Sequence, residues 1–406
     1  MFFKLNKILL IISLLLINLS SLYIVNLNHF INNLNKYSIY RQPKYILLFD
    51  YIYSPVCEDL NAFIIFEYFL KNNITDAYYI INDKSELYKR LLKHNKTKNI
   101  IPFKISSFNK QLFPFILNSK IIVQSYALYA FQKITSSVKY LKFLYICHAV
   151  NYFKISIIQE QLSFLDKNKQ NIILTSPYEY RLYKKLNLYN EKSMYKGGLP
   201  RYDRFLYTQK SSFENDCILI SFTYRSYGKS TYENSLFKKN INNLLADPSL
   251  ITFLEKKNID LIFIQHHHDE IRKRDININY TPNIKFLNQQ NLEHYIVQCS
   301  LYITDFSSIS FDFMFQHKPV LFYHLDINDK IEFKEKAFMK IDYNNSIYFN
   351  NIFVEQNSLV NKIKYYVNRN FTLEKGLDEK YNTLFYNKKN ITKKIIEIIN
   401  KIIEED

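Results

Sequence analysis

The chain has 406 residues, which is long enough for two ordinary domains with their own hydrophobic cores. Its formal net charge of +17 suits an anionic partner such as a lipid surface, a polyphosphate polymer or a nucleic acid. The sequence contains no zinc-finger spacing, aromatic RNA-binding motif or helix-turn-helix pattern, so we expect no nucleic-acid partner.

An almost wholly apolar segment at residues 8–25 follows Lys4 and Lys7 near the amino terminus. This pattern is typical of a signal peptide or a signal anchor. No small-residue cleavage site follows it, and both flanks are basic, so the positive-inside rule does not fix its orientation. We therefore predict that residues 1–40 form an uncleaved anchor or an interfacial segment that holds the protein at a membrane surface.

Strands and helices alternate through the next part of the chain, residues 41–205. Such alternation is typical of a parallel, doubly wound sheet, and we predict a Rossmann-like domain here. The apolar runs that predict strands are at residues 45–50, 77–81, 120–124 and 143–147, and the periodic segments that predict helices are at residues 61–70 and 84–94.

The same alternation restarts in residues 206–375, which we predict to be a second Rossmann-like domain. Residues 376–406 form a helical segment in which residues 391–403 place isoleucines on one face, as a core-packing helix does. Two such domains in tandem predict a cleft between them. The second set of predicted strands is at residues 217–221, 261–265, 301–304 and 320–323, with a helix at residues 232–245.

The four cysteines are widely spaced and lie in apolar, strand-like runs. They are Cys57, Cys147, Cys217 and Cys299. This distribution is typical of reduced core residues in a cytoplasmic domain, and we expect no disulfide.

The segment that begins at Thr304 resembles a phosphate cradle. Asp305 and Ser307 are good helix N-caps just after a predicted strand, and Ser308 adds a second hydroxyl. Free backbone N–H groups and the positive end of a helix dipole favour a phosphate at such a position.

Other polar residues also follow predicted strands, where open α/β sheets bind their ligands. His148 follows one strand, and an imidazole there is either a general base or a lone structural histidine. Arg225 follows another. His266 and His267 belong to a triplet at residues 266–268, but no carboxylate or cysteine spacing completes a metal site, so contact of an imidazole with phosphate is favoured.

Two of the chain's four glycines stand together at Gly197 and Gly198. They predict an unusual backbone conformation or a close approach of neighbouring atoms. Arg201 follows them and either binds phosphate or forms an ion pair with Asp203.

Several of these segments resemble motifs of the CDP-glycerol glycerophosphotransferase family, the membrane-associated polymerases and primases of teichoic-acid-like polymers. Residues 304–323 resemble its T-D-Y-S-S-x-x-F-D-F...P-x-x-x-Y signature, and residues 218–225 resemble a strand that ends in P-T-W/Y-R, with Phe222 in place of the proline. Residues 198–203 resemble G-x-P-R-x-D, and residues 265–268 resemble R/K-x-H-P, which points to His267, with His268 in place of the proline. The H-G-x-x-x-K element of the family corresponds to residues 148–154, where alanine replaces the glycine and the lysine comes one place later.

The resemblance implies a GT-B-like fold in which residues 41–205 form the acceptor domain and residues 206–375 the nucleotide-donor domain. It also implies transfer of a polyol phosphate from a CDP-activated donor to a hydroxyl, with release of CMP. The acceptor would be an anionic cell-surface polymer or a lipid-linked primer. Catalytic roles are implied for His148, as the base for the acceptor hydroxyl, and for His267. The residues expected to bind the donor are Arg201, Arg225, His266, Thr304, Asp305, Ser307 and Ser308.

Beyond the donor substrate we expect no cofactor and no metal, because arginine, histidine and a helix terminus can neutralise the phosphates. Cytidine nucleotides are cytoplasmic, so we expect the protein at the cytoplasmic face of the cell membrane. Two alternatives share the architecture. One is a GT-B glycosyltransferase that uses a nucleotide sugar, and the other is a catalytically degenerate, membrane-bound protein that binds polymer.

Overall fold

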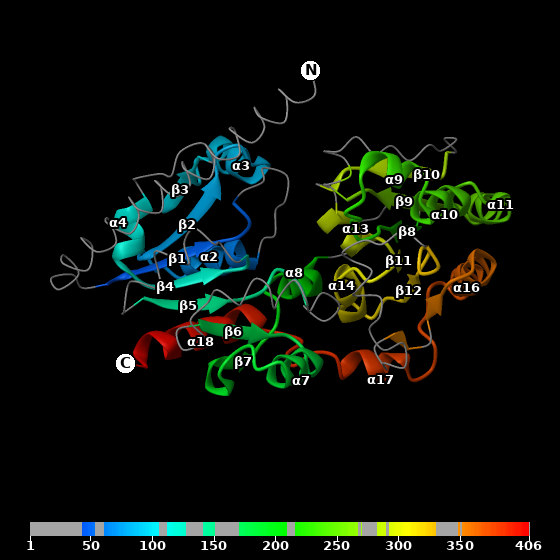
Figure 1. Cartoon of the computed structure of the whole chain (residues 1–406). Coiled ribbons are helices and arrows are strands. Elements are labelled where there is room, and N and C mark those ends of the chain that lie inside the picture. The colour runs from blue at the N-terminus through cyan, green and yellow to red at the C-terminus, as the bar shows by residue number, and fades with distance from the viewer. Residues whose placement is uncertain are drawn as a thin grey trace, which may run out of the picture.

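The computed structural model describes residues 43–52, 61–104, 112–126, 141–150, 170–208, 216–266, 269, 282–289, 292–329, 348–349 and 351–405. These residues form two parallel sheets with helices packed around them (Figure 1). The prediction of two parallel-sheet α/β domains is confirmed. The apolar segment at residues 8–25 lies outside the described residues, and none of the described helices has both the length and the apolar character to cross a membrane.

The first sheet contains seven described strands in the order β3-β2-β1-β4-β5-β6-β7, each parallel to its neighbours. Helices cover both faces of this sheet, so successive residues of a strand belong to different hydrophobic cores. In β1, Leu48 lies in the core on the α2 side and Leu47 in the core on the α4 side. The elements are β1 (Tyr45–Phe49), α2 (Asn61–Lys71), β2 (Ala77–Asn82), α3 (Glu86–Lys93), β3 (Ile100–Phe103), α4 (Leu112–Leu117), β4 (Ser119–Gln124), β5 (Lys142–Tyr145), β6 (Gln170–Leu174), α7 (Pro177–Lys185) and β7 (Met194–Lys196).

Helix α8 (Arg201–Tyr207) leads to the second sheet, whose described strands have the order β10-β9-β8-β11-β12-β13 and are again all parallel. Its central strands are buried along their whole length, apart from the first residue of β8. The elements are β8 (Asp216–Ile220), α9 (Lys229–Glu233), α10 (Leu236–Leu245), α11 (Pro248–Lys257), β9 (Ile259–Ile264), β10 (Ile284–Leu287), α13 (Leu292–Gln298), β11 (Leu301–Thr304), α14 (Ile309–Phe315), β12 (Val320–Tyr323), β13 (Ile352–Phe353), α16 (Gln356–Asn368) and α17 (Leu377–Asn382).

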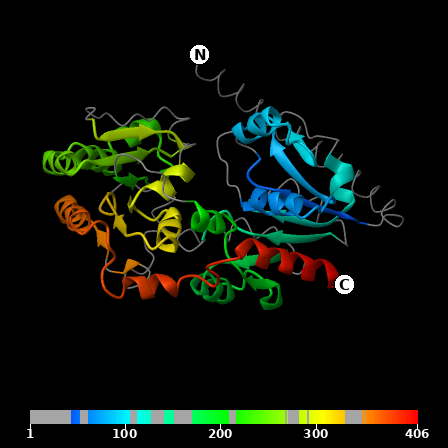
Figure 2. The same ribbon diagram turned by 180° about the vertical axis from the view of Figure 1, so that it is seen from behind.

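The last helix, α18 (Ile391–Glu404), returns from the second domain to pack on the first, as both ribbon views show (Figure 1, Figure 2). Asp203 of α8 caps it, since its carboxylate accepts from the backbone N–H groups of Ile391 at 3.0 Å and Thr392 at 2.7 Å. The core-packing role predicted for this helix is confirmed, because its isoleucine face is buried. The residues of that face are Ile395, Ile398, Ile399 and Ile402.

The single helix predicted at residues 232–245 is wrong. The structure has two helices, α9 and α10, and Ser235 separates them. The Ser235 hydroxyl accepts from the backbone N–H of Lys238 at 3.2 Å, which is the capping interaction that starts a new helix.

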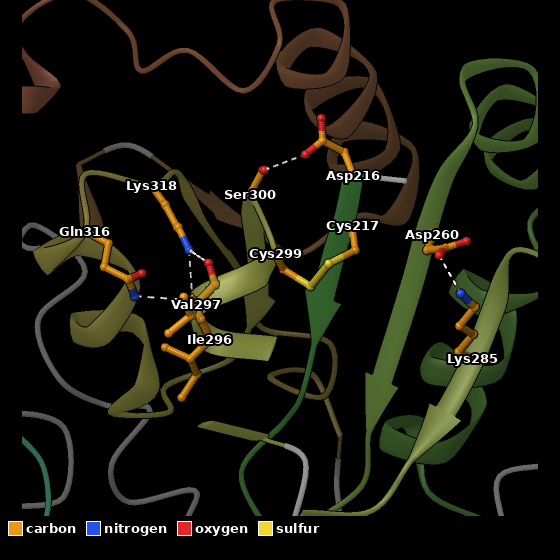
Figure 3. The surroundings of a disulfide bond; sticks show 10 residues. All are labelled: Asp216, Cys217, Asp260, Lys285, Ile296, Val297, Cys299, Ser300, Gln316 and Lys318. Atoms are coloured by element: carbon orange, nitrogen blue, oxygen red, sulfur yellow. Dashed lines mark hydrogen bonds and ion pairs between the residues drawn. A yellow bond between two sulfur atoms is a disulfide. The ribbon is translucent and has the colours of Figure 1, made fainter. Parts of the chain in front are cut away.

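The expectation that the cysteines are all reduced is also wrong. Cys217 and Cys299 form a disulfide with a Cα–Cα distance of 4.6 Å, whereas Cys147 is a buried thiol. Cys57 lies outside the described residues. Figure 3 shows the bond between Cys217, the second residue of β8, and Cys299, which lies two positions before β11. The hydrogen bond between Ser300 and Asp216, 3.1 Å long, lies beside it. It lies at the amino ends of two adjacent strands, opposite the edge at which open α/β sheets bind ligands.

The close approach predicted at the paired glycines is confirmed. A Cβ atom on Gly197 would lie 2.4 Å from Cγ2 of Ile173, and one on Gly198 would lie 3.0 Å from Cγ2 of Ile391. Neither glycine has a positive φ, so the backbone conformation does not require glycine here. The reason for glycine is steric, because a side chain would overlap the neighbouring isoleucine.

We expect Gly197→Ala to lower the free energy of unfolding by about 1–3 kcal/mol, because the added methyl overlaps a buried isoleucine. Gly228→Ala is the matched control, since the nearest atom to its Cβ is 3.9 Å away. Denaturant unfolding measures both variants. Equal midpoints for the two would contradict the steric explanation.

Candidate active site

Both sheets reverse their strand order, the first between β1 and β4 and the second between β8 and β11. Ligands of open α/β sheets bind beyond the carboxyl ends of the strands at such a point. His148 follows β5 in the first domain, and the turn from Asp305 to Ser308 follows β11 in the second. His267 lies outside the described residues, so its catalytic role stays a prediction.

The loop that carries His148 is held by both its backbone and its ring. The carbonyl of His148 accepts hydrogen bonds from Asn61 Nδ2 at 3.5 Å and from Arg201 Nη1. Its partly exposed imidazole stacks on Tyr126, which follows β4, with ring centroids 4.4 Å apart and planes at 26°. The preceding residue, Cys147, has a φ of 55°, which is uncommon for any residue other than glycine. The imidazole therefore has a fixed orientation at the sheet edge, as a general base requires.

A buried carboxylate lies at the end of β1 in the same domain. Asp50 accepts from the backbone N–H groups of Ala62 at 2.9 Å and Phe63 at 3.0 Å and from the Tyr79 hydroxyl at 2.9 Å, so it fixes the start of α2. Burial raises its pKa to about 6, against the hydrogen bonds that lower it. Asp50 was not among the predicted site residues, although it follows β1 as His148 follows β5. The rule that ligands bind beyond the carboxyl ends of strands would have indicated it.

Arg201 does not form the predicted alternative ion pair with Asp203, which caps α18 instead. Its guanidinium makes a bidentate pair with Asp312 of α14, through Nε at 3.2 Å and Nη2 at 2.8 and 3.0 Å. The Arg201 side chain is 13% exposed and that of Asp312 is 1% exposed. Contact of Arg201 with a donor phosphate would require it to leave a buried carboxylate.

Asp305 joins the ends of β8 and β11 in the second domain. Its carboxylate accepts from the backbone N–H of Thr223 at 3.0 and 3.2 Å and from the N–H of Phe306 at 2.6 Å. Thr304 is fully buried, with its hydroxyl 3.5 Å from the Asp305 carboxylate. Both residues therefore shape the turn from inside the protein.

Arg225 is fully buried beneath this turn. It donates to Asp326 from Nε at 2.7 Å and from Nη2 at 3.0 Å, and its Nη1 lies 2.8 Å from the Asp305 carboxylate. Burial works to lower the pKa of Arg225, but the charges of Asp326 and Asp305 raise it above its usual value. The guanidinium faces these two carboxylates inside the domain, so contact of Arg225 with pyrophosphate would require it to leave them, and that contact stays a prediction.

The two serines after Asp305 reach the start of α14. Ser307 is almost buried, and its carbonyl accepts from the backbone N–H of Ser310 at 3.1 Å and from the Ser310 hydroxyl at 2.7 Å. Ser308 stands at the N-cap, is partly exposed, and makes no side-chain capping bond. Its hydroxyl is thus in position to meet a ligand at this edge.

His266 follows β9, is partly exposed, and has its ring centroid 5.7 Å from that of Tyr224. His267 and His268 lie outside the described residues. Among the residues that the structure describes, no three histidine, cysteine or acidic side chains are grouped to hold a metal ion.

These features belong to a two-domain α/β protein. A turn with two serines follows a strand of one sheet, and a histidine fixed by hydrogen bonds and ring stacking follows a strand of the other. Residues 41–401 match the family described as CDP-Glycerol:Poly(glycerophosphate) glycerophosphotransferase. Because this match spans most of the chain, the protein belongs to that family of phosphotransferases, and the resemblance seen in its motifs is confirmed.

One relative is the minor teichoic acid biosynthesis protein GgaB of Bacillus subtilis (strain 168), which is 27% identical over 374 residues. The aligned region covers 86% of this chain and 39% of GgaB, so the chain spans well under half of that relative.

Solved structures of the wall teichoic acid polymerase TagF have a similar fold, and one gives a TM-score of 0.63 with 15% identity over 91% of each chain. A putative UDP-N-acetylglucosamine 2-epimerase from Listeria monocytogenes gives a TM-score of 0.56 with 12% identity, over 89% of this chain and 98% of that chain. At these identities the likeness shows the fold alone.

We expect Arg225→Met to lower the free energy of unfolding by about 3–5 kcal/mol, because it leaves two buried carboxylates without their cation. Arg204→Met is the control. Arg204 pairs with Glu67 at 2.7 Å but is 32% exposed, so its loss should cost less than about 1 kcal/mol. Thermal and denaturant unfolding measure both. Full stability of Arg225→Met together with loss of donor binding would instead support direct contact with the donor.

Proposed function

We propose that the protein transfers a polyol phosphate, such as glycerol phosphate, from a CDP-activated donor to a hydroxyl of a cell-surface polymer or a lipid-linked acceptor. Family membership supports this reaction class, and one TagF structure was obtained with a CDPG soak. The observation that supports the proposal most directly is the connection between the His148 loop in the first domain and the serine turn in the second. Through Arg201, the His148 loop of the first domain is bonded to α14, the helix that begins with the serine turn.

In this reaction His148 accepts the proton of the acceptor hydroxyl. The oxygen attacks the phosphorus that carries the polyol, the bond from that phosphorus to the bridging oxygen breaks, and CMP leaves with that oxygen. The Ser308 hydroxyl and the backbone N–H groups around it would stabilise charge on the phosphates, with His266 and His267 as further donors. Arg225 and Asp305 contribute by fixing the turn. We propose no metal and no cofactor.

The purified protein should release CMP from CDP-glycerol or CDP-ribitol when acceptor is present. His148→Ala should lower turnover by about 10²- to 10⁴-fold, because the general base is lost, while the dissociation constant of the donor changes little. His317→Ala is a matched control at a histidine that pairs with Asp378 on the surface. Turnover by His148→Ala at the wild-type rate would remove the proposed base.

A ligand panel separates this proposal from its alternatives. Protection against thermal unfolding by CDP-polyols, but not by UDP-sugars, would support the polyol-phosphate donor. Protection by nucleotide sugars would favour a glycosyltransferase, and no protection by any nucleotide would favour a degenerate, polymer-binding protein.

We also propose that the protein acts at the cytoplasmic face of the cell membrane, where cytidine nucleotides are made. The basic charge of +17 and the apolar segment at residues 8–25 support association with an anionic membrane. Protease added to intact cells should leave the two α/β domains uncut, and lysed cells provide the control for cleavage. Digestion of the domains in intact cells would contradict this location.

A further inference from the structure

Helix α8 lies between the two domains, beside α14, in both ribbon views (Figure 1, Figure 2). Tyr202 stacks on Phe315 of α14, with ring centroids 4.1 Å apart and planes at 20°. Arg201, the first residue of the helix, pairs with Asp312 one turn earlier on α14. The start of α8 is therefore fixed to the helix that carries the serine turn.

Arg201 is fixed to the first domain as well. Its Nη1 donates to the carbonyl of His148, and its backbone N–H donates to Asn61 Oδ1 at 3.1 Å. Asn61 in turn donates from Nδ2 to the carbonyls of Cys147 at 3.4 Å and His148 at 3.5 Å. A single guanidinium thus bonds to the histidine loop of one domain and to a buried carboxylate of the other.

The backbone that Arg201 holds is one that needs support. Cys147 has a left-handed φ of 55°, a conformation that costs a non-glycine residue free energy and persists where the surroundings impose it. The carbonyls that receive the hydrogen bonds belong to this residue and the next. Loss of the guanidinium would free the His148 loop to relax toward a more common conformation.

We propose that Arg201 is a positioning residue that sets the His148 imidazole relative to the serine turn, rather than a ligand of the donor phosphate. The inference rests on the proposed function, in which His148 takes the acceptor proton and the serine turn holds the donor. Small errors in the alignment of reacting groups lower turnover without weakening the binding of either substrate. The effect of Arg201 should therefore appear in kcat.

Arg204 provides a matched control one turn further along α8. It also joins the domains, with Nη2 at 2.7 Å from Glu67 of α2 and Nη1 at 3.7 Å from Glu293 of α13. None of its described ion pairs involves the His148 loop. A comparison of the two arginines separates positioning of the histidine from general alignment of the domains.

The experiment measures kcat and the donor dissociation constant for Arg201→Lys, Arg201→Ala and Arg204→Ala. Arg201→Lys keeps a cation opposite buried Asp312, so we expect this variant to fold even if Arg201→Ala does not. A lysine has no second nitrogen to donate to the His148 carbonyl while its ammonium pairs with Asp312. We expect both Arg201 variants to lose about 10- to 100-fold in kcat, with the donor dissociation constant within about threefold of wild type. Arg204→Ala should keep kcat within about threefold of wild type.

Equal losses of kcat at Arg201 and Arg204, or a loss of donor affinity at Arg201, would overturn the proposal. Hydrogen exchange of residues 146–150 tests it without turnover, and so separates its failure from failure of the proposed function. If wild-type protein releases no CMP, the proposed function fails, yet faster exchange in Arg201→Lys than in Arg204→Ala still supports the positioning role. Equal exchange in the two variants overturns it.

Discussion

The buried ion pair between Arg201 and Asp312 is the charged contact that links the second domain to the His148 loop of the first. Burial raises the pKa of Asp312 above its ordinary value, and the neighbouring charge of Arg201 does not fully offset this effect. Such a pair contributes little net stability, because removing two charges from water costs about as much as their attraction returns. What it supplies is a defined geometry, since a planar guanidinium meets a carboxylate in one orientation. Because the same guanidinium reaches the His148 carbonyl, the orientation of one domain's loop is tied to the other domain's helix.

A second buried charge cluster gives the serine turn its shape. Asp305 accepts from backbone groups on the ends of both β8 and β11, and Arg225 joins it to Asp326 beyond β12. Three adjacent strand ends of the second sheet are thereby locked together beneath the turn. The aromatic rings of Phe237 and Phe306 lie 4.5 and 4.9 Å from the guanidinium and keep water from it. The turn thus starts from a rigid support, which is the condition for holding phosphate groups without reorganisation.

Much of the fold could be predicted from the sequence, because strands buried on both faces appear as continuous apolar runs whose ends are marked by polar residues. The predicted strand at residues 301–304 coincides with β11, and the one at residues 320–323 with β12. The partners of the polar residues could not be predicted, since they come from distant parts of the chain. Arg201 meets Asp312 across 111 positions, and the disulfide joins cysteines 82 positions apart whose proximity depends on which strands are neighbours. The break at Ser235 was missed because helical periodicity continues across it, while the cap is a local hydrogen bond.

We expected Arg201 and Arg225 to neutralise the donor phosphates, but in the structure both guanidinium groups pair with carboxylates of the protein. Arg225 faces two carboxylates and Arg201 faces one, so neither guanidinium brings uncompensated positive charge to the candidate site. In the proposed reaction the pyrophosphate would then be held mainly by hydroxyls, backbone N–H groups and imidazoles, among them Ser308 and His266. Such groups act as oriented dipoles, and they stabilise developing charge well only if their positions are set before the substrate arrives. The buried ion pairs provide that preorganisation, so the arginines serve the chemistry through the protein groups they hold in place.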